Sequence, residues 1–274
     1  MKSKHGKLIL GLGAALAAPL FLLAPGGASK RQKAPFLGVN FAHRGLHSRD
    51  KAVPENSLEA FRRAAEAGYG VELDVQLSKD GQVVVFHDAD LQRVCGVEDR
   101  VDELTYAELN RLSLCGSESG VPLFSDVLRV IRGRGPLLVE LKTGKRNREL
   151  CEKTRALLDN YRGEVCIESF NPFIVAWFRF HAPDLLRGQL ATRSKAYRKD
   201  GVHPLRAFFL SHTLYNFISR PKFIAYEIGY RPPTVRFAEA LGAMRFGWTS
   251  HEPRNEKGRD AVIFEFYKPK LKFK

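Results

Sequence analysis

Eight short apolar runs recur along this 274-residue chain, and amphipathic stretches separate them. The runs are Val39–His43, Val71–Gln76, Leu137–Lys142, Val165–Ser169, Leu185–Leu190, Phe223–Glu227, Arg245–Thr249 and Ala261–Phe266. Strands that alternate with helices form parallel sheets, and eight such units predict a (β/α)8 TIM barrel of the α/β class. An open doubly wound sheet is the alternative, but the chain has no glycine-rich dinucleotide loop and no Walker loop.

Local signals place helices between these runs. Asn56 followed by Glu59 matches a capping box, and Gly68 predicts the end of that helix. Asn171-Pro172 is a capping residue followed by proline at the first helical position. These signals agree with the alternation and strengthen the barrel prediction.

The N-terminal residues 1–34 differ in composition from the rest. Residues 8–24 are uncharged and rich in Leu and Ala, with three basic residues on each side. We expect a signal peptide or a membrane anchor, that is, a hydrophobic helix ahead of a barrel domain at 35–268. An anchor places the catalytic domain outside the cytoplasm, and a cleaved leader makes it secreted. Equal basic flanks do not set the orientation.

The net charge of +14 is concentrated at the ends of the chain. Residues 1–33 contain six basic residues, and residues 268–274, which include the basic tail 269–274, contain four. Without these ten, the rest of the chain has a net charge of only +4. That is no footprint for nucleic acid, so we expect no nucleic-acid partner. Basic ends suit a chain near an anionic membrane, although solvated tails have the same composition.

The four cysteines show no metal-ligand spacing. Cys151 and Cys166 fall in a predicted helix and strand, where a buried free thiol is typical. Cys95 and Cys115 are candidates for a disulfide, and the sequence does not decide whether they pair.

Two of the predicted strands carry acids on one face. Glu72 and Asp74 alternate with apolar residues, and Glu140 and Lys142 do so in the next strand. In a barrel the apolar face packs on the helices, so these polar side chains point inward. Three carboxylates in one cavity repel one another unless a cation lies among them, and carboxylate oxygens suit Ca²⁺ or Mg²⁺. Ion pairs with Lys142 and Arg44 are the metal-free alternative.

A predicted hairpin brings a histidine toward this cluster. Asp80-Gly81 is typical of a two-residue turn, and that turn sets Asp74 opposite His87 on the same side of the sheet. The plainer interpretation is a structural histidine whose loop is supported by Asp88.

His43 ends the first strand beside Arg44. Two histidines near a metal, with an arginine and a lysine, fit phosphoryl transfer. One imidazole removes a proton from the nucleophile and the other protonates the leaving oxygen. Arg44 and Lys142 would hold the phosphate oxygens.

With these residues in place, the chain resembles the glycerophosphodiester phosphodiesterase family from about Val39 to Phe266. The shared motifs are His43-Arg44-Gly45, Pro54-Glu55-Asn56-Ser57, Glu72-Leu73-Asp74-Val75-Gln76, Asp80-Gly81, Val84-Val85-Phe86-His87-Asp88, Leu91 with Arg93, Glu140-Leu141-Lys142, Ser169-Phe170 and Trp248-Thr249. Their number and order make the resemblance specific, whereas any one motif alone is weak.

The resemblance implies a metal-dependent barrel hydrolase that splits glycerophosphodiesters, or lysophospholipids, into glycerol 3-phosphate and an alcohol. The implied roles are an acid–base pair of His43 and His87, metal ligands Glu72, Asp74 and Glu140, and phosphate contacts Arg44 and Lys142. Alternatives on the same fold are sphingomyelinase D and phosphoinositide phospholipase activity. A tethered lipid-binding module without catalysis is a third possibility.

Other positions carry weaker signals. Glu55 is expected to hold the loop after the first strand or simply to begin a helix, and Trp248 to line the cavity or to pack. Ser57 replaces the usual Thr. The partial Trp248-Thr249-Ser250 motif and the ending Glu265, where Asp is common, place the differences from the family on the substrate side of the pocket. His47 is expected in a solvated loop.

The remaining histidines form no ligand spacing; they are His5, His181, His203, His212 and His251. The aromatic stretch is expected to be helix core, with insertion into a bilayer as the alternative; it comprises Phe208, Phe209, Tyr215, Phe217, Phe223 and Tyr226.

Overall fold

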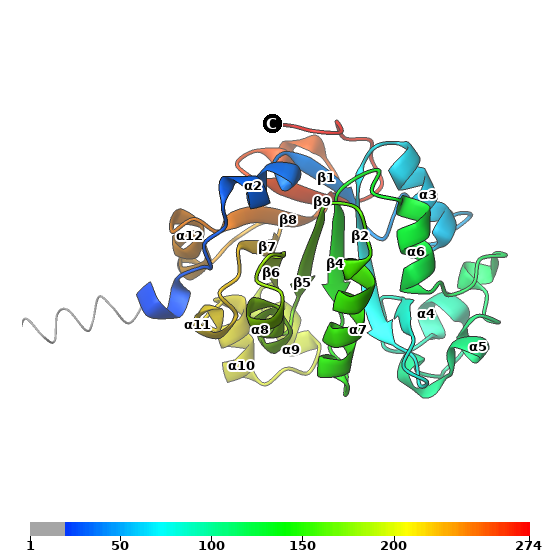
Figure 1. Ribbon diagram of the computed structural model, residues 1–274. Helices are drawn as coiled ribbons and strands as arrows, with labels where there is room; N and C mark the ends of the chain where they lie inside the picture. Colours follow the sequence, from blue (N-terminus) through cyan, green and yellow to red (C-terminus); the bar gives the residue numbers. More distant parts are fainter. Residues whose placement is uncertain (1–19) are drawn as a thin grey trace, which may run out of the picture.

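The computed structural model describes residues 20–274 and shows a closed parallel barrel (Figure 1). Its strands are β1 (Val39–Ala42), β2 (Gly70–Leu77), β3 (Val83–Val85), β4 (Leu137–Leu141), β5 (Val165–Ser169), β6 (Leu186–Ala191), β7 (Phe223–Glu227), β8 (Met244–Ser250) and β9 (Ala261–Phe264). The order is β1-β9-β8-β7-β6-β5-β4-β2-β3, and β1 also pairs with β2, which closes the barrel. The eight-stranded TIM barrel is therefore confirmed, with β3 as an antiparallel extension of β2.

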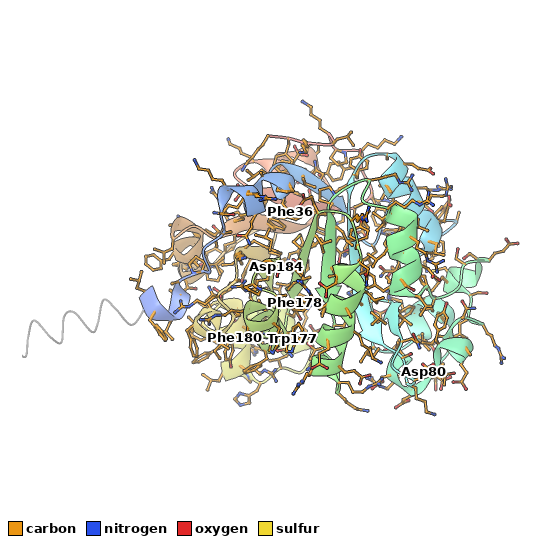
Figure 2. The ribbon with its side chains drawn as sticks, viewed as in Figure 1. Phe36, Asp80, Trp177, Phe178, Phe180 and Asp184 are labelled. Atoms are coloured by element: carbon orange, nitrogen blue, oxygen red, sulfur yellow. The ribbon has the colours of Figure 1, made fainter. Side chains whose placement is uncertain are left out.

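Helices surround the barrel. They are α2 (Lys30–Lys33), α3 (Leu58–Glu66), α4 (Gln92–Cys95), α5 (Tyr106–Leu109), α6 (Phe124–Ile131), α7 (Asn147–Asp159), α8 (Pro172–His181), α9 (Ser194–Lys199), α10 (Pro204–Ser211), α11 (Asn216–Ser219) and α12 (Pro233–Ala240), with short 3₁₀ turns at Ala34–Phe36, Val101–Glu103, Leu114–Gly116 and Pro253–Glu256. Helix α8 shows how each helix is divided between core and solvent: Phe178 is fully buried, whereas Phe180 is exposed (Figure 2). As predicted, the Asn171 side chain caps α8 by accepting a hydrogen bond from the Phe173 amide at 3.0 Å.

The barrel interior changes from apolar to charged along its length. Phe41, Phe223 and Phe246 belong to the apolar cluster inside the barrel. Gly188 makes room for this cluster, because a Cβ at that position would lie 2.0 Å from the Phe223 ring. The carboxylates lie nearer the carboxyl ends of the strands. The apolar layers thus support a polar layer at the mouth, by which we mean the end of the barrel where the strands terminate.

Two long connections build the surroundings of the mouth. Residues 86–123, between β3 and α6, enclose a small apolar cluster of their own, which includes Phe86 and Leu114. Residues 192–222, between β6 and β7, contain α9, α10 and α11. We call residues 192–222 the cap.

The opposite end of the barrel is closed by Phe36, ahead of β1, and by the C-terminal tail. Phe36 is buried in the cluster inside the barrel. The Phe273 amide donates to the Gly38 carbonyl at 2.9 Å, so the basic tail lies against β1. Residues 20–23 are helical and rest beside α11, where the Asn216 side chain donates to the Leu23 carbonyl at 3.1 Å.

Most of the predicted anchor, residues 1–19, lies outside the described residues. Within residues 20–274, no helix is long and apolar enough to cross a membrane. The division into leader, domain and tail stays a prediction.

Two local predictions are wrong. The cap of α3 is Ser57, whose hydroxyl accepts from the Ala60 amide at 3.1 Å, and Asn56 is one residue too early. The hairpin turn is also one residue longer than predicted, because Ser78 pairs with Gln82. Asp74 therefore lies opposite Phe86, not His87.

All four cysteines are free thiols in the structure. Cys151 and Cys166 are buried, as expected for a helix and a strand position. Burial, and then the neighbouring Cys115, raises the pKa of Cys95 to about 11. This thiol is therefore protonated at neutral pH.

Candidate active site

Three carboxylates meet at the mouth, as the strand patterns predict. Glu72 and Asp74 project inward from β2, and Glu140 projects from β4, where it pairs in register with Asp74. Each offers an oxygen within 4.8 Å of the others, and all three side chains are buried. Parallel strands in register place these groups together without help from any loop.

Two cations lie among these acids. Lys142 Nζ is 2.8 Å from Asp74 Oδ1 and 2.7 Å from Glu140 Oε1. Arg44 Nε is 3.5 Å from Asp74 Oδ2, and the Arg44 backbone amide donates to Glu72 Oε2 at 2.9 Å. Arg44 and Lys142 are thus placed beside the cluster, and they form the ion pairs expected of a metal-free site.

A fourth carboxylate was not predicted. Glu168 on β5 pairs in register with Glu140, is buried, and has one oxygen without a hydrogen-bond partner among the described residues. A sequence signal for it exists, because Glu168 falls on the same inward-facing parity as Glu140 once the barrel is assumed.

Burial and mutual repulsion shift the pKa values of these acids. Burial, then the charges of Asp74 and Glu140, raises the pKa of Glu72 well above its usual value. Burial, then the charges of Glu140 and Asp74, does the same to the pKa of Glu168. Burial opposes ionisation of Asp74 too, but Lys142 and nearby His87 and Arg44 hold its pKa well below the usual range.

The charges of this cluster fit a divalent cation. Glu72, Asp74, Glu140 and Glu168 carry four negative charges when ionised, and Arg44 and Lys142 supply two positive ones. The two remaining charges equal those of one divalent cation. The donors are carboxylate oxygens, which suit Ca²⁺ or Mg²⁺ rather than a soft metal.

His43 is held by a carboxylate from the last strand region. Glu265 Oε1 lies 3.3 Å from His43 Nδ1 and 2.9 Å from His47 Nε2. The expectation of a solvated His47 is wrong, because its side chain is nearly buried against Glu265. Glu265 also differs from its expected place on the substrate side, since it contacts the proposed catalytic histidine. Burial lowers the pKa of His43, and the bond from Glu265 offsets this only in part.

His87 is held in the same way. Its Nδ1 lies 2.6 Å from Asp88 Oδ1, and Arg93 donates to the other Asp88 oxygen at 2.6 Å. Burial opposes ionisation of Asp88, but these hydrogen bonds lower its pKa below the ordinary range. Although the hairpin register is not the predicted one, the charge of His87 still acts on Asp74 and Glu140.

Glu55 joins the two loops that carry the histidines. It accepts from Arg44 at 2.6 Å and from Arg93 at 2.6 Å. Burial opposes its ionisation, yet Arg93 and Arg44 lower its pKa to about 2. This geometry agrees with the expected loop-holding role. Asn56, predicted only as a helix cap, donates to Asp74 Oδ2 at 2.9 Å and adopts a positive φ of 55°.

The side of the mouth under the cap is apolar. A cavity of about 560 Å³ is lined by Thr143, Phe170, Asn171, Thr192, Ala196, Tyr197, Asp200, Val202, Arg206, Leu210, Glu227 and Trp248. Trp248 packs edge-on against Phe170 with ring centroids 5.7 Å apart, and its indole donates to the Ala225 carbonyl at 3.3 Å. Trp248 therefore lines the cavity, as one of its two interpretations expected.

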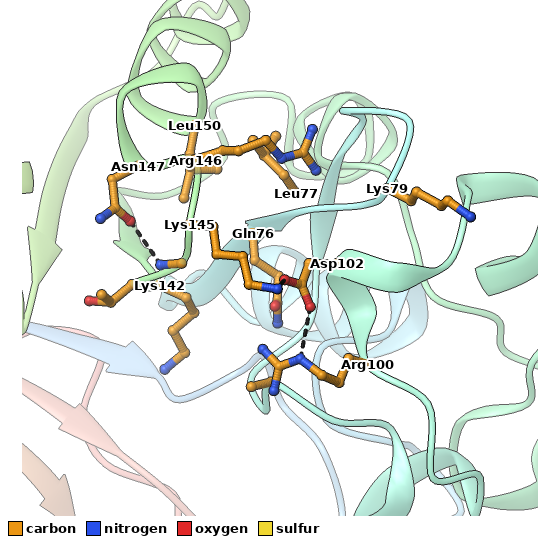
Figure 3. Close-up of a pocket in the computed structure, with 13 residues that line it drawn as sticks. Gln76, Leu77, Lys79, Arg100, Asp102, Lys142, Lys145, Arg146, Asn147 and Leu150 are labelled. Atoms are coloured by element: carbon orange, nitrogen blue, oxygen red, sulfur yellow. Dashed lines mark hydrogen bonds and ion pairs between the residues drawn. The ribbon is translucent and has the colours of Figure 1, made fainter.

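The other side of the mouth is basic. A pocket of about 290 Å³ lies between the ends of β2 and β4 and is lined by Lys79, Arg100, Lys142, Lys145 and Arg146 among others (Figure 3). Asp102 is the acid in this lining, and it pairs with Arg100 at 3.0 Å and Lys145 at 3.5 Å. The two pockets flank Thr143, directly after β4.

The sequence model of the glycerophosphoryl diester phosphodiesterase family matches residues 43–266, which include the whole constellation. The chain belongs to this family. A glycerophosphodiester phosphodiesterase from Bacillus altitudinis is 34% identical over 157 residues, which cover 53% of this chain and 63% of that protein. A lysophospholipase D from Rattus norvegicus is 32% identical over 158 residues, which cover 53% of this chain and 48% of that protein.

Solved structures of this phosphodiesterase family share the fold. A glycerophosphodiester phosphodiesterase from Thermotoga maritima is 27% identical with a TM-score of 0.61, and the match covers 82% of this chain and 94% of that one. A phosphodiesterase from Oleispira antarctica, solved with the product sn-glycerol-3-phosphate, is 23% identical with a TM-score of 0.68. It shows the same fold over 85% of this chain and 94% of that one. The chain spans just under two thirds of the first two curated relatives, 63% and 65%.

Proposed function

We propose that this protein hydrolyses glycerophosphodiesters to glycerol 3-phosphate and an alcohol, with a divalent cation, Ca²⁺ or Mg²⁺, held by Glu72, Asp74 and Glu140. One observation carries the proposal: two histidines border the carboxylate cluster, and each is held by its own carboxylate. Histidines with a purely structural role would need neither a carboxylate partner each nor a carboxylate cluster beside them. Family membership and the relatives named above support the reaction class.

The two histidines suit opposite halves of an acid–base cycle. His43 is buried and its lowered pKa keeps it neutral, so it can accept a proton from the attacking oxygen. Glu265 then stabilises the imidazolium. His87 donates through Nδ1 to the ionised Asp88, and this bond orients the ring so that its other nitrogen can deliver a proton to the leaving oxygen.

Arg44 and Lys142 are assigned to the phosphate. Both lie beside the acids, Arg44 with a planar fork that is held by Glu55 and Lys142 as a point charge. A bound cation would take over the neutralisation of the carboxylates and stabilise negative charge on the phosphate. The two side chains are then free to donate to the oxygens of the substrate.

The apolar cavity favours an alcohol with a hydrophobic part, so lysophospholipids are the second candidate substrate. The cavity opens beside Trp248 and Phe170 and exceeds what a glycerol group fills. The lysophospholipase D from Rattus norvegicus supports the same class. We also propose that the N-terminal segment anchors the protein to a membrane with the barrel outside the cytoplasm.

Hydrolysis of glycerophosphocholine by the purified chain tests the proposal. We expect glycerol 3-phosphate as product, loss of activity with EDTA, and recovery when Mg²⁺ or Ca²⁺ is added in excess. Activity that survives both EDTA and His43→Ala would refute the mechanism. A cyclic phosphate product, or a retained lipid, would instead favour the sphingomyelinase D or phosphoinositide type, and binding without turnover a lipid-binding module.

A further inference from the structure

The outer face of the cap combines exposed hydrophobic side chains with basic ones. Leu205 and Phe208 on α10 are 63% and 46% exposed, and Phe209 beside them is also exposed. These residues stand on the side of α10 opposite Ala207 and Leu210, which are buried. Inward packing therefore does not account for them, since α10 already has an apolar face for the barrel.

Aromatic contacts extend this face across neighbouring helices. Phe208 contacts Phe209 with ring centroids 6.2 Å apart, Phe209 contacts Tyr215 at 5.9 Å, and Tyr215 contacts Phe173 of α8 at 6.2 Å. Phe173 itself is 58% exposed. The structure thus has a continuous apolar strip from α10 to α8, which we call the aromatic strip: Leu205, Phe208, Phe209, Tyr215 and Phe173.

Charge identifies the kind of partner. Residues 193–222 contain seven basic residues and one acid, although the body of the chain is close to neutral. Lys195, Arg198 and Lys199 are exposed on α9. Within residues 193–222, Arg193 is the one basic residue whose side chain forms an ion pair, and its partner is Glu227. An apolar strip bordered by basic residues is the composition of surfaces that lie in the interface of an anionic bilayer.

The start of the described chain lies on the same flank. Residues 20–22 are exposed and apolar, and Phe21 contacts Phe217 of α11 with ring centroids 6.0 Å apart. In Figure 1 the first described helical turn lies beside α11. Residues 20–23, which belong to the end of the uncharged Leu- and Ala-rich stretch, therefore lie beside the cap. A membrane held by that stretch would face the aromatic strip.

We propose that the cap docks on an anionic lipid surface through the aromatic strip and the bases of α9. Because Ala196, Tyr197 and Leu210 on the inner side of the same segment line the apolar cavity, docking sets that cavity beside the lipid. The proposal rests on the proposed function for this consequence and for the N-terminal anchor. Docking itself is independent of catalysis.

Tryptophan quenching in vesicles tests docking without any activity measurement. The full chain is reconstituted into vesicles of phosphatidylcholine and phosphatidylglycerol with brominated acyl chains, as Phe208→Trp and as the control Leu271→Trp. Leu271 is similarly exposed, 49%, but its side chain lies beside Gly68, just ahead of β2 at the opposite end of the barrel. Both variants keep Trp177 and Trp248, so the difference isolates the added indole.

We expect the indole at 208 to lose roughly half its emission and the one at 271 to lose little, because interfacial aromatic rings reach the acyl boundary. Arg198→Gln and Lys199→Gln should each lower the docked-to-undocked ratio about five-fold. Vesicles without phosphatidylglycerol should also lower this ratio for the parent surface, because they carry no negative charge. Equal quenching at 208 and 271 would overturn the proposal. Quenching at 208 that ignores both charge changes would overturn the anionic partner.

A second measurement separates docking from the proposed function. The double variant Phe208→Ser/Phe209→Ser should hydrolyse lysophosphatidylcholine in vesicles roughly ten-fold more slowly and soluble glycerophosphocholine within about two-fold of the parent. Equal losses on both substrates would overturn docking. If the parent hydrolyses neither substrate, the proposed function fails, while the quenching result still decides the docking.

Discussion

The two sides of the barrel mouth are built in different ways. On the β2 and β4 side, which we call the charged side, side chains are fixed by several partners each: Asp74 alone contacts Lys142, Arg44 and Asn56. On the side under the cap, the apolar side, Phe170 and Trp248 are held mainly by ring packing. Geometry on the charged side is therefore stiff, which bond making requires, whereas the apolar side can adapt to different alcohols.

Loss of a histidine on the charged side should have the largest effect. We expect His43→Ala to lower kcat for glycerophosphocholine by roughly 10²–10⁴, because a positioned proton acceptor contributes that much. Steady-state kinetics on the metal-loaded enzyme measures it. His203→Gln, an exposed histidine at the start of α10, is the matched control and should stay near the parent rate. A smaller loss for His43→Ala than for the control would disprove its role.

Glu168 should matter for the cation more than for the fold. Glu168→Gln removes one of the four carboxylates, so we expect metal affinity to fall by roughly 10–100-fold, the effect typical of groups that support metal ligands. The metal-free protein should become more stable, because an amide removes the cost of burying an ionisable carboxyl beside Glu140 and Asp74. Calorimetric titration with Mn²⁺ and thermal unfolding measure the two effects. Unchanged affinity would remove Glu168 from the metal site.

Much of the charged side could be predicted because strand alternation decides which residues face inward. Once Glu72, Asp74 and Glu140 were assigned to barrel strands, their convergence followed from the parallel register. The same argument applies to Glu168, because strand alternation places its side chain on the inward face of its strand. Sequence could not show that Glu265 holds His43, because the contact joins residues 222 positions apart.

The hairpin shows a different limit. The sequence Asp80-Gly81 predicts a turn, but its length depends on whether Ser78 bonds Gln82, and this side-chain bond shifts the register by one. On the apolar side, the cap is a long connection between β6 and β7, and no motif in the sequence marks its cavity. The aromatic stretch, which was expected to be helix core, divides in the structure: Phe223 and Tyr226 are buried on strand β7, whereas Phe208 and Phe209 of α10 are exposed.

Replacing Glu265 tests the charged side through the pH dependence of the reaction. Its hydrogen bond raises the pKa of His43, so Glu265→Gln should lower that pKa further. A base that must be neutral then stays active at lower pH, and the acid limb of kcat/KM moves to lower pH. We also expect the plateau to fall roughly ten-fold, because the imidazolium loses its counter-charge. The pH profile of kcat/KM measures both. An acid limb that moves upward or stays fixed would contradict the pairing.

The smallest effect is expected on the apolar side. Phe170→Ala removes a ring that contacts both Trp248 and Tyr197 in the cavity lining. We expect KM for lysophosphatidylcholine to rise about ten-fold, a change typical of losing apolar contacts in a pocket, with little change in kcat. The ratio of kcat/KM for this substrate to that for glycerophosphocholine measures the discrimination. Equal losses for both substrates would show that the two sides of the mouth act as one rigid unit, because the apolar side would then be positioning the phosphate and not the alcohol.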